Sequence, residues 1–441
     1  TWINGFSFTS ENANVEVEMG LGEENGTLDE YEEPVIRMDA KVEATLPSEV
    51  EFEKEFEFSL TVKANGNEGK EITATGSFTS DNNNSLSSLK YYDEESSSWK
   101  EITNLGDGFG NTLKDVTVRY RATLDYNGEN ELNFALNTTD GKTYKTTNKI
   151  YVYDGLSVVL VNGVDYMDME AAIASNPNGT FKFLKDCEFN YGLVFTGNVT
   201  LDLNGKTISI GVANKAIVSD ANANLTIKNG TIKGVNYALQ VEDDAVLTVE
   251  KDVNIIVNGD VEGSRYGVTM WENGTLNFEG NIKVTHGIGI SGNGMNKIYN
   301  AKLNVTGGTI TVEDGTGIYL PHYGTTVISG GEVTAPTGIN IKAGSLDITG
   351  GTIKATGEKV SPKATTGKTN ETGDAIIIEE NTNYADNIKL NITGGELEST
   401  NGYLIQEYNP TLGTENELTS VISGLYTVKN VIDENTFYYT K

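Results

Sequence analysis

The residues of this sequence that could bind a ligand are few, and the clearest group is aromatic. Trp271 follows one apolar phrase, and His322 with Tyr323 follows a later phrase of the same type. Asn293 occupies the equivalent place between them, and Tyr266 extends the line. If the phrases are stacked strands, the rings lie about 10 Å apart along one edge. Amphipathic rings beside amide groups suit sugar rings; the alternative is that these rings shield an apolar edge of the solenoid or cover a long loop.

A second group is basic. Lys359, Lys363 and Lys368 lie among Thr, Gly and Ser in the segment 354–374, which predicts an insertion loop. On an acidic chain, this loop could contact an anionic ligand such as a uronic-acid-rich polysaccharide. The alternative is a solvated loop with no ligand, because surface insertions cost little.

Groups for acid–base or metal chemistry are scarce. Two histidines, His286 and His322, and a single cysteine, Cys187, leave little room for a zinc centre or a histidine triad. Asp243 and Asp244 are adjacent carboxylates, but they fall at a turn and favour a solvated corner over a glycosidase pair. Acidic clusters leave calcium binding open without predicting it: they are 23–24, 29–30, 32–33 and 93–95.

Composition narrows the classes of protein. The chain has 441 residues, with 32 Lys and Arg against 63 Asp and Glu, for a net charge of −31. Such a charge argues against nucleic-acid partners. No stretch reaches the roughly 20 apolar residues of a membrane span, so we expect no membrane insertion. The 49 glycines and 7 prolines indicate a turn-rich all-β protein. With no leader visible at Thr1, we expect a mature or cytosolic chain.

The first third reads as a β-sandwich. Residues 34–155 hold runs such as 52–62, 116–122 and 132–136, in which apolar and polar residues alternate. Alternation with period two buries one face of each strand, and about seven such strands are typical of an immunoglobulin-like domain. Residues 1–33 are more acidic and less regular, and could add strands.

From residue 156 to 441 an internal repeat takes over. Its phrase is apolar-x-apolar-x-(Gly/Asn)-Gly-x-apolar, with copies that begin at Leu201, Leu225, Leu247, Leu276, Leu303, Thr326 and Leu346. The spacing of 20 to 29 residues is that of one coil of a β-solenoid. A second phrase, such as 237–241 or 266–270, lies between the copies, which makes three strands per coil. Residues 168–174 read as a short amphipathic helix that caps the first coil.

The run from Gly192 to Ile208, followed by the Leu-x-Ile-x-Gly-Gly-x-Ile repeat, resembles pectate-lyase-like right-handed parallel β-helices. The nearest resemblance is to large bacterial surface adhesins, in which Ig-like domains often precede the helix. The resemblance implies that a lyase of this fold would use calcium-binding aspartates and an arginine base. Arg265 is the single arginine of the repeat region, near Asp260, Glu262 and Glu272. We interpret it as a surface residue paired with one of these acids.

These observations predict an all-β protein, with an Ig-like sandwich followed by a right-handed, single-stranded parallel β-helix. The expected function is non-catalytic adhesion to a polysaccharide, host glycan or glycoprotein, at a bacterial cell surface or after secretion. Candidate ligand-binding residues are Trp271, His322, Tyr323, Asn293, Tyr266, Arg265, Lys359, Lys363 and Lys368, with no catalytic or metal site and no cofactor. A self-associating subunit of a surface layer or filament, and a polysaccharide lyase or glycoside hydrolase, remain alternatives.

Overall fold

The computed structural model describes residues 39–408, except 82, 213–215, 259–264, 295–298, 381–383 and 385–387. Outside that range it describes short backbone strands only: β1 (Val15–Val17), β2 (Ile36–Met38), β38 (Thr414–Glu415), β39 (Ile422–Ser423), β40 (Tyr426–Lys429) and β41 (Thr436–Tyr439). β1 pairs antiparallel with β2, so one extra strand lies in the segment 1–33. The acidic clusters 23–24, 29–30 and 32–33 lie outside the described residues.

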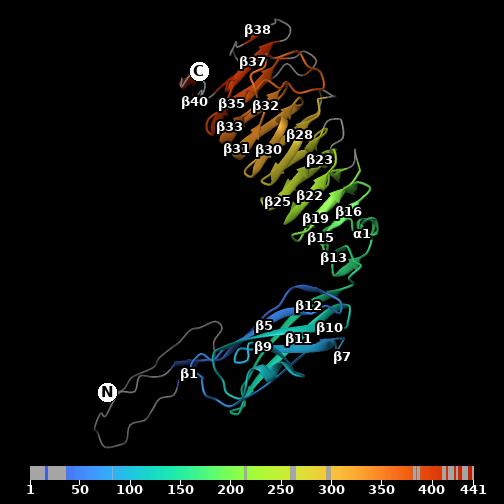
Figure 1. Cartoon of the computed structure of the whole chain (residues 1–441), viewed down its shortest axis with the longest axis vertical. Coiled ribbons are helices and arrows are strands. Elements are labelled where there is room, and N and C mark those ends of the chain that lie inside the picture. The colour runs from blue at the N-terminus through green and yellow to red at the C-terminus, as the bar shows by residue number, and fades with distance from the viewer. Residues whose placement is uncertain are drawn as a thin grey trace, which may run out of the picture. The chain divides into compact units, whose positions relative to one another are not determined.

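The chain divides into two compact units, Thr1–Leu156 and Ser157–Lys441. The first is a sandwich of two five-stranded sheets (Figure 1). One sheet has the order β3 (Lys41–Thr45), β5 (Phe56–Lys63), β10 (Val116–Leu124), β8 (Leu86–Asp93), β9 (Ser98–Glu101). The other has the order β4 (Glu49–Glu51), β12 (Thr143–Tyr153), β11 (Gly128–Thr138), β6 (Ile72–Ser80), β7 (Asn83–Asn84).

The alternating pattern places one face of each sheet in a shared core. In β5 the buried residues are Phe58, Leu60 and Val62, whereas Glu57 and Lys63 face water. The 3-10 turn η1 (Leu105–Gly108) is held by the Tyr120 hydroxyl, which donates to the Leu105 carbonyl oxygen at 2.6 Å. This buried bond satisfies the one polar atom that Tyr120 carries into the core.

The second unit is a parallel β-solenoid. Each coil contributes a strand to each of three faces. Face A contains β15 (Gly179–Phe183), β18 (Asn198–Asp202), β21 (Asn224–Lys228), β24 (Val246–Val249), β27 (Thr275–Phe278), β29 (Asn300–Val305), the start of β31 (Tyr323–Ala335), the start of β33 (Ser345–Ala355) and β35 (Lys389–Ile392).

Faces B and C complete each coil. Face B contains β16 (Cys187–Phe189), β19 (Thr207–Ile210), β22 (Gly230–Gly234), β25 (Val253–Val257), the starts of β28 (Asn281–Gly292) and β30 (Thr309–Leu320), the ends of β31 and β33, and β36 (Glu396–Ser399). Face C contains β17 (Leu193–Phe195), β20 (Ile217–Ser219), β23 (Tyr237–Val241), β26 (Tyr266–Met270), the ends of β28 and β30, β32 (Thr337–Ile341), β34 (Ile376–Glu379) and β37 (Ile405–Asn409).

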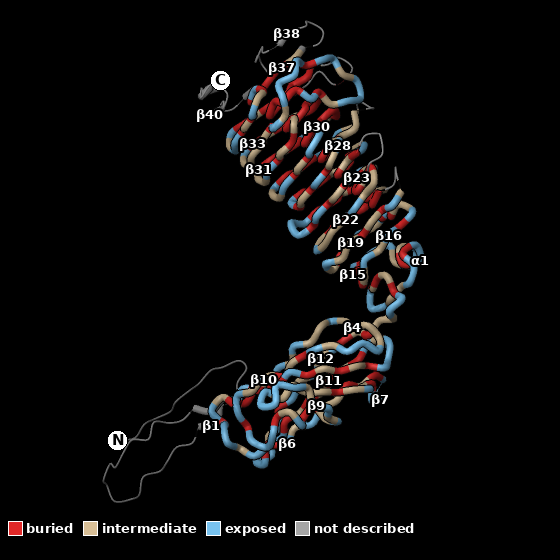
Figure 2. Tube along the Cα trace, in the orientation of Figure 1, coloured by how far each residue is buried: buried red, intermediate tan, exposed pale blue. Residues whose placement is uncertain are grey.

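Inward side chains of each face stack on the same position of the next coil and fill the interior. The buried residues recur along the coils in Figure 2. The repeat therefore marks the coils correctly, with one adjustment. The residue of the first coil that pairs with Leu225 is Val199, not Leu201. Leu201 pairs with Ile227, so the first copy of the phrase was placed two residues too late. A shift of two keeps the side chain on the same face of the strand, which is why the phrase was recognisable in sequence.

The paired glycines of the repeat have a steric cause. Their second member has a positive φ, for example 74° at Gly308, 83° at Gly331 and 83° at Gly351. A Cβ on Gly308 would lie 1.8 Å from the Gly280 carbonyl oxygen. Only glycine fits such a corner between two stacked coils.

A short cap precedes the first coil. β13 (Val159–Val161) and β14 (Val164–Tyr166) form a hairpin, and β13 pairs antiparallel with β15. Helix α1 (Met169–Ser175) follows, with the Asp168 carboxylate accepting from the backbone N–H groups of Glu170 and Ala171. Met169 and Ala172 join the solenoid core, so the predicted capping helix is confirmed. Among the described residues, no helix has the length and hydrophobicity required to cross a bilayer.

Candidate functional site

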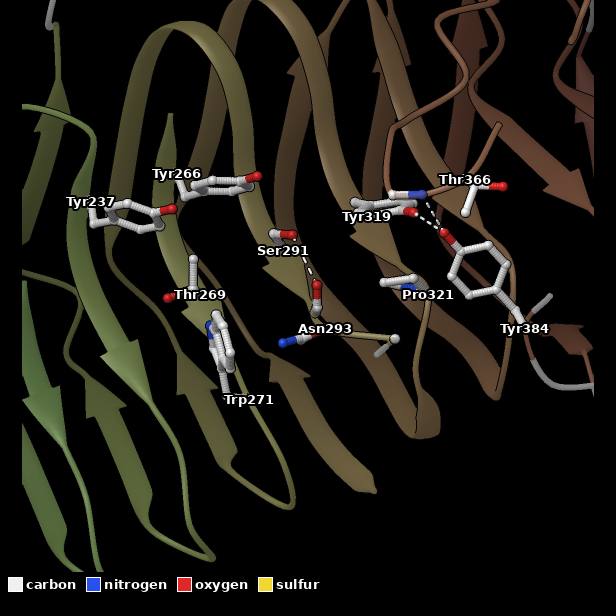
Figure 3. Close-up of a pocket in the computed structure, with 13 residues that line it drawn as sticks. Tyr237, Tyr266, Thr269, Trp271, Ser291, Asn293, Tyr319, Pro321, Thr366 and Tyr384 are labelled. Atoms are coloured by element: carbon white, nitrogen blue, oxygen red, sulfur yellow. Dashed lines mark hydrogen bonds between the residues drawn. The ribbon is translucent and has the colours of Figure 1, made fainter. Parts of the chain in front are cut away.

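An open groove of about 460 Å³ lies on the outer side of face C (Figure 3). Strands β23, β26, β28 and β30 form its floor, and residues beyond β33 and β34 close one end. Its lining residues are Tyr237, Tyr266, Thr269, Trp271, Ser291, Gly292, Asn293, Gly294, Tyr319, Pro321, Thr366, Gly367 and Tyr384. The lining therefore combines aromatic rings with hydroxyl and amide groups.

Strand register brings the lining residues together. Thr269 pairs with Ser291, and Ser291 pairs with Tyr319, so these three outward positions form a row across neighbouring coils. Tyr237 pairs in the same way with Tyr266 at the start of the strand. Because parallel strands lie about 4.8 Å apart, the rows run along the solenoid axis.

Four tyrosines shape the groove. The rings of Tyr237 and Tyr266 stack with centroids 5.2 Å apart and an interplanar angle of 20°, and burial raises the pKa of Tyr237. Tyr319 and Tyr384 lie at the opposite end, with their hydroxyl oxygens 3.4 Å apart. Figure 3 shows Tyr237, Tyr266 and Tyr319 spaced along the groove. A flat ligand could thus meet ring faces over several coils.

A second outward row lies two residues further along each strand. Met270 pairs with Gly292, so Trp271 and Asn293, one residue later, occupy equivalent places. Ser291 pairs with Tyr319, so Pro321, two residues after Tyr319, is equivalent to Asn293. Trp271 is the groove residue among the exposed large hydrophobic side chains, at 36% exposure.

Glu242 holds the same place as Trp271 one coil earlier. Burial, and then the neighbouring acids, raise the pKa of the Glu242 carboxyl. Those acids are Asp220, Glu272 and Asp243, so negative charges lie near this end of the groove.

The structure brings three of the predicted residues together: Tyr266, Trp271 and Asn293 all line the groove. His322 and Tyr323 do not line it. The equivalent of Trp271 on the coil of His322 is Pro321, so His322 is one residue out of step and its side chain points to the other side of the strand. Tyr323 instead packs against Ala343 and Tyr384.

His322 is a buried residue beneath the groove floor, 4% exposed. A Cβ added to Gly292 would lie 1.8 Å from its Nδ1 atom, so the ring fills the space that a side chain at position 292 would need. Its Nδ1 has no hydrogen-bond partner among the described residues. Burial lowers the pKa of His322 to about 4, which keeps the ring neutral at physiological pH.

Arg265 is also buried, at 6% exposure, and does not line the groove. Its carbonyl oxygen accepts from the backbone N–H of Ile288 at 2.9 Å, which places it at the start of β26. The expectation of a surface arginine is therefore wrong, because only 6% of the residue is exposed. Of its three expected partners, Asp260 and Glu262 lie outside the described residues, and Glu272 lies at the turn after β26.

The lysines of the insertion segment have different environments. Lys359 Nζ donates to Asp374 Oδ1 at 3.0 Å and to Gln406 Oε1 at 2.6 Å, and lies 3.9 Å from the ring centroid of Tyr403. It is committed to the fold and is not a free cation. Lys363 and Lys368 are exposed on the same segment. They remain candidates for contact with a ligand.

The remaining polar candidates stay outside the groove. Asp243 and Asp244 are exposed at a corner, both with positive φ, as expected of a turn. His286 pairs with Asp314 through Nδ1 at 2.9 Å on an exposed edge. Asp93 pairs with Lys100 and accepts from Ser96 at 2.6 Å. Among the residues the structure describes, no three His, Cys, Asp or Glu side chains converge on a common point.

Sequence reasoning missed Tyr237, Tyr319 and Tyr384. Tyr237 carried a signal, since it begins the same phrase as Tyr266 one coil earlier. Tyr319 carried one too, as the middle residue of an apolar phrase whose neighbours point inward. Tyr384 lies in the connection after β34, and no repeat places it.

No protein-family model matches the chain, and no curated protein matches it. Among solved structures, a conjugative transposon lipoprotein from Bacteroides eggerthii is 14% identical, with 25% of this chain and 96% of that chain covered and a TM-score of 0.19. The SrpA adhesin from Streptococcus sanguinis is 16% identical, with 31% and 76% covered and a TM-score of 0.18. Each likeness covers less than a third of this chain.

Proposed function

We propose that this chain is a non-catalytic surface adhesin that binds an uncharged glycan in the groove of face C. The solenoid is then a pectate-lyase-like β-helix with a binding role, and the sandwich is an Ig-like spacer at a bacterial surface. The observation that carries the proposal is the groove itself, in which four tyrosines and Trp271 surround Thr269, Ser291 and Asn293.

The composition of the lining supports a neutral ligand. None of its thirteen residues is Asp, Glu, Lys, Arg or His. Rings that present a flat face, beside groups that donate and accept hydrogen bonds, match the alternating apolar and hydroxyl surfaces of a pyranose. The net charge of −31 and the acids around Glu242 favour an uncharged ligand over a uronic-acid polymer.

The lining also supports binding over cleavage. Hydrolysis of a glycosidic bond uses a pair of carboxyl groups on either side of the bond, whereas the described lining offers phenol, indole, hydroxyl and amide groups. Activity would therefore have to come from groups outside this groove.

The experiment is a glycan-array screen of the intact chain, with product analysis for every glycan that binds. We expect retention of neutral oligosaccharides without cleavage. Trp271→Ala and Tyr266→Ala should each weaken binding about tenfold or more, because central aromatic residues dominate such sites. Tyr126→Ala is the matched control, since Tyr126 is an exposed tyrosine of the sandwich.

Three results would contradict the proposal. Cleavage of a bound glycan would make the protein an enzyme, and tighter binding of oligogalacturonate than of neutral chains would move the site to Lys363 and Lys368. Absence of any glycan binding, together with assembly seen by electron microscopy or light scattering, would favour a structural subunit.

A further inference from the structure

The outward row of face C changes character along the solenoid. Ser291 and Tyr319 line the groove and are each 5% exposed, whereas the next residue of the row, Asn340, pairs with Tyr319 and is fully buried. Ile377 follows one coil later and is also fully buried, although it points outward. Something covers face C from the coil of β32 onward.

The cover is the insertion between β33 and β34, residues 356–375. The backbone N–H of Asn370 donates to Asn340 Oδ1 at 2.9 Å, and the N–H of Thr372 donates to Thr337 Oγ1 at 2.9 Å. The segment therefore lies directly on the floor that would otherwise continue the groove.

A buried ion pair fixes the insertion to the coils beneath it. Lys342 Nζ lies 3.1 Å from Glu379 Oε2, and both side chains are fully buried. The same nitrogen donates to the carbonyl oxygens of Thr365, at 3.0 Å, and Lys368, at 2.8 Å. Glu379 in turn accepts from the backbone N–H of Thr365 at 2.9 Å and from Asn370 Nδ2 at 2.9 Å. We call this set the latch.

Through the latch, the insertion becomes a wall at one end of the groove. Thr366 and Gly367 lie between the two latched carbonyl groups and line the groove. The N–H of Gly367 donates to the Tyr384 hydroxyl at 2.6 Å, and the Lys342 ammonium lies 5.1 Å from the Tyr384 ring centroid. Figure 3 shows Tyr319, Thr366 and Tyr384 together at this end, opposite Tyr237.

We propose that the groove binds the terminus of a linear, uncharged glycan end-on, with the terminal sugar against Tyr319 and the wall of Thr366, Gly367 and Tyr384. This inference rests on the proposed function and narrows its ligand to chain ends. A chain that follows the ring rows along the axis has no path across Asn340, because the insertion occupies it. The floor from β23 to β30 spans four coils, roughly 14 Å, so the site accepts a short terminal stretch.

The test uses linear hexaoses of glucose, mannose and N-acetylglucosamine with the intact chain. Each is used free, capped at the reducing end by a biotin linker, and capped at the non-reducing end by a bulky benzylidene group. We expect one of the two caps to weaken binding about tenfold or more, because the capped end then clashes with the wall. Cyclomaltohexaose has no ends, so its binding should be weaker than that of maltohexaose by at least the factor seen for the capped maltohexaose.

Binding that neither cap weakens would overturn the end-on inference and leave the proposed function standing. Binding of none of the hexaoses in any form would overturn the proposed function, and the inference with it. The two failures are therefore distinguishable in one experiment on the unaltered protein.

A variant then tests the latch. Lys342→Met removes the ammonium that ties Thr365 and Lys368 to Glu379, so the wall should loosen. We expect faster tryptic cleavage after Lys363 and Lys368, and a smaller penalty for the capped hexaose. The control is Lys283→Met, which breaks the exposed pair between Lys283 and Glu313. An unchanged cap penalty in a Lys342→Met protein whose insertion is cleaved faster would show that the wall does not select chain ends.

Discussion

Face C contains two regions, built from equivalent strands of different coils, that differ in what covers their outer side. Between β23 and β30, its outward residues are rings and small polar groups that line a groove. Between β32 and β37, the outward residues Asn340, Lys342, Ile377 and Glu379 are all fully buried under the insertion. The difference shows that the coil sets where a side chain points, and a connection between coils decides whether water reaches it.

The covered region also carries charge that the groove lacks. Lys342 and Glu379 are stable there because each of their polar atoms has several partners. Burial alone lowers the pKa of Lys342, and the carboxylate of Glu379 opposes that shift. We therefore expect substitutions in the covered region to lower the free energy of unfolding more than substitutions in the groove.

The largest expected effect is on the covered region. Glu379→Ala leaves the Lys342 ammonium buried without its carboxylate, which should cost about 3–5 kcal/mol of unfolding free energy. Urea unfolding followed by Trp271 fluorescence measures it, since Trp271 is the one tryptophan of 157–441. A loss below 1 kcal/mol would mean that water reaches the latch and that the two regions are not distinct.

The second effect concerns acid stability beneath the open region. Because burial holds the pKa of His322 at about 4, against about 6.5 in the unfolded chain, folding favours the neutral ring. Above about pH 6.5 the histidine is neutral in both states and costs no unfolding free energy. As the pH falls below 6.5 towards 4, the unfolded chain takes up a proton that the folded chain does not, and the unfolding free energy falls by about 3 kcal/mol in all.

Unfolding of the wild type and of His322→Phe at pH 7 and pH 4.5 measures this term. The wild type should lose more stability than the variant over that interval. His286→Gln is the control for the loss of a histidine at an exposed position, since His286 lies on an exposed edge beside Asp314. Equal losses in the wild type and His322→Phe would show that the ring is hydrated.

A smaller effect is expected for Gly292→Ala, which adds a Cβ against the His322 ring. Displacing that ring should cost about 1–3 kcal/mol, as overpacking of a core does. Gly110→Ala serves for comparison: nothing lies within 4 Å of its added Cβ, so its cost reflects a φ of 72° alone. Thermal unfolding distinguishes the two variants, and equal stability of Gly292→Ala and wild type would contradict the packing seen here.

The smallest effect belongs to the exposed surface. Lys283→Met breaks an ion pair whose side chains are about half exposed, at 56% and 49%. Such pairs contribute about 0–1 kcal/mol because water screens them. Urea unfolding should place this variant within 1 kcal/mol of wild type, and a larger loss would mean that surface pairs rival the latch.

The sequence predicts the strands well and the groove in part, because only residues inside the repeat have positions that the periodicity determines. Apolar alternation recurs in every coil and a glycine corner in most of them, so the position of Trp271 beside Asn293 follows from the repeat. His322 illustrates the limit, since a register error of one residue exchanges the inside and the outside of a strand. The position equivalent to Trp271, which the sequence pattern assigned to His322, is occupied by Pro321.

Parts of the site that lie outside the repeat had no such signal. Lys359 looked like a free cation in a basic loop, yet its partners Asp374 and Gln406 come from residues 15 and 47 positions later. Tyr384 reaches the groove only because the insertion and the connection after β34 fold against each other. Contacts of this kind depend on tertiary packing that local pattern does not encode.

The insertion has an evolutionary consequence. The corresponding connection one coil earlier, between Ala335 and Thr337, is the single residue Pro336, whereas the one after Ala355 runs for twenty residues. Stacked coils contact mainly their neighbours, so a connection of this kind can lengthen or shorten without rebuilding the core. A relative with a tight turn here would have a longer, open-ended trough, and one with a bulkier turn a shallower pit. Mutation of a single linker could thus diversify the ligands of a whole lineage while its scaffold stays constant.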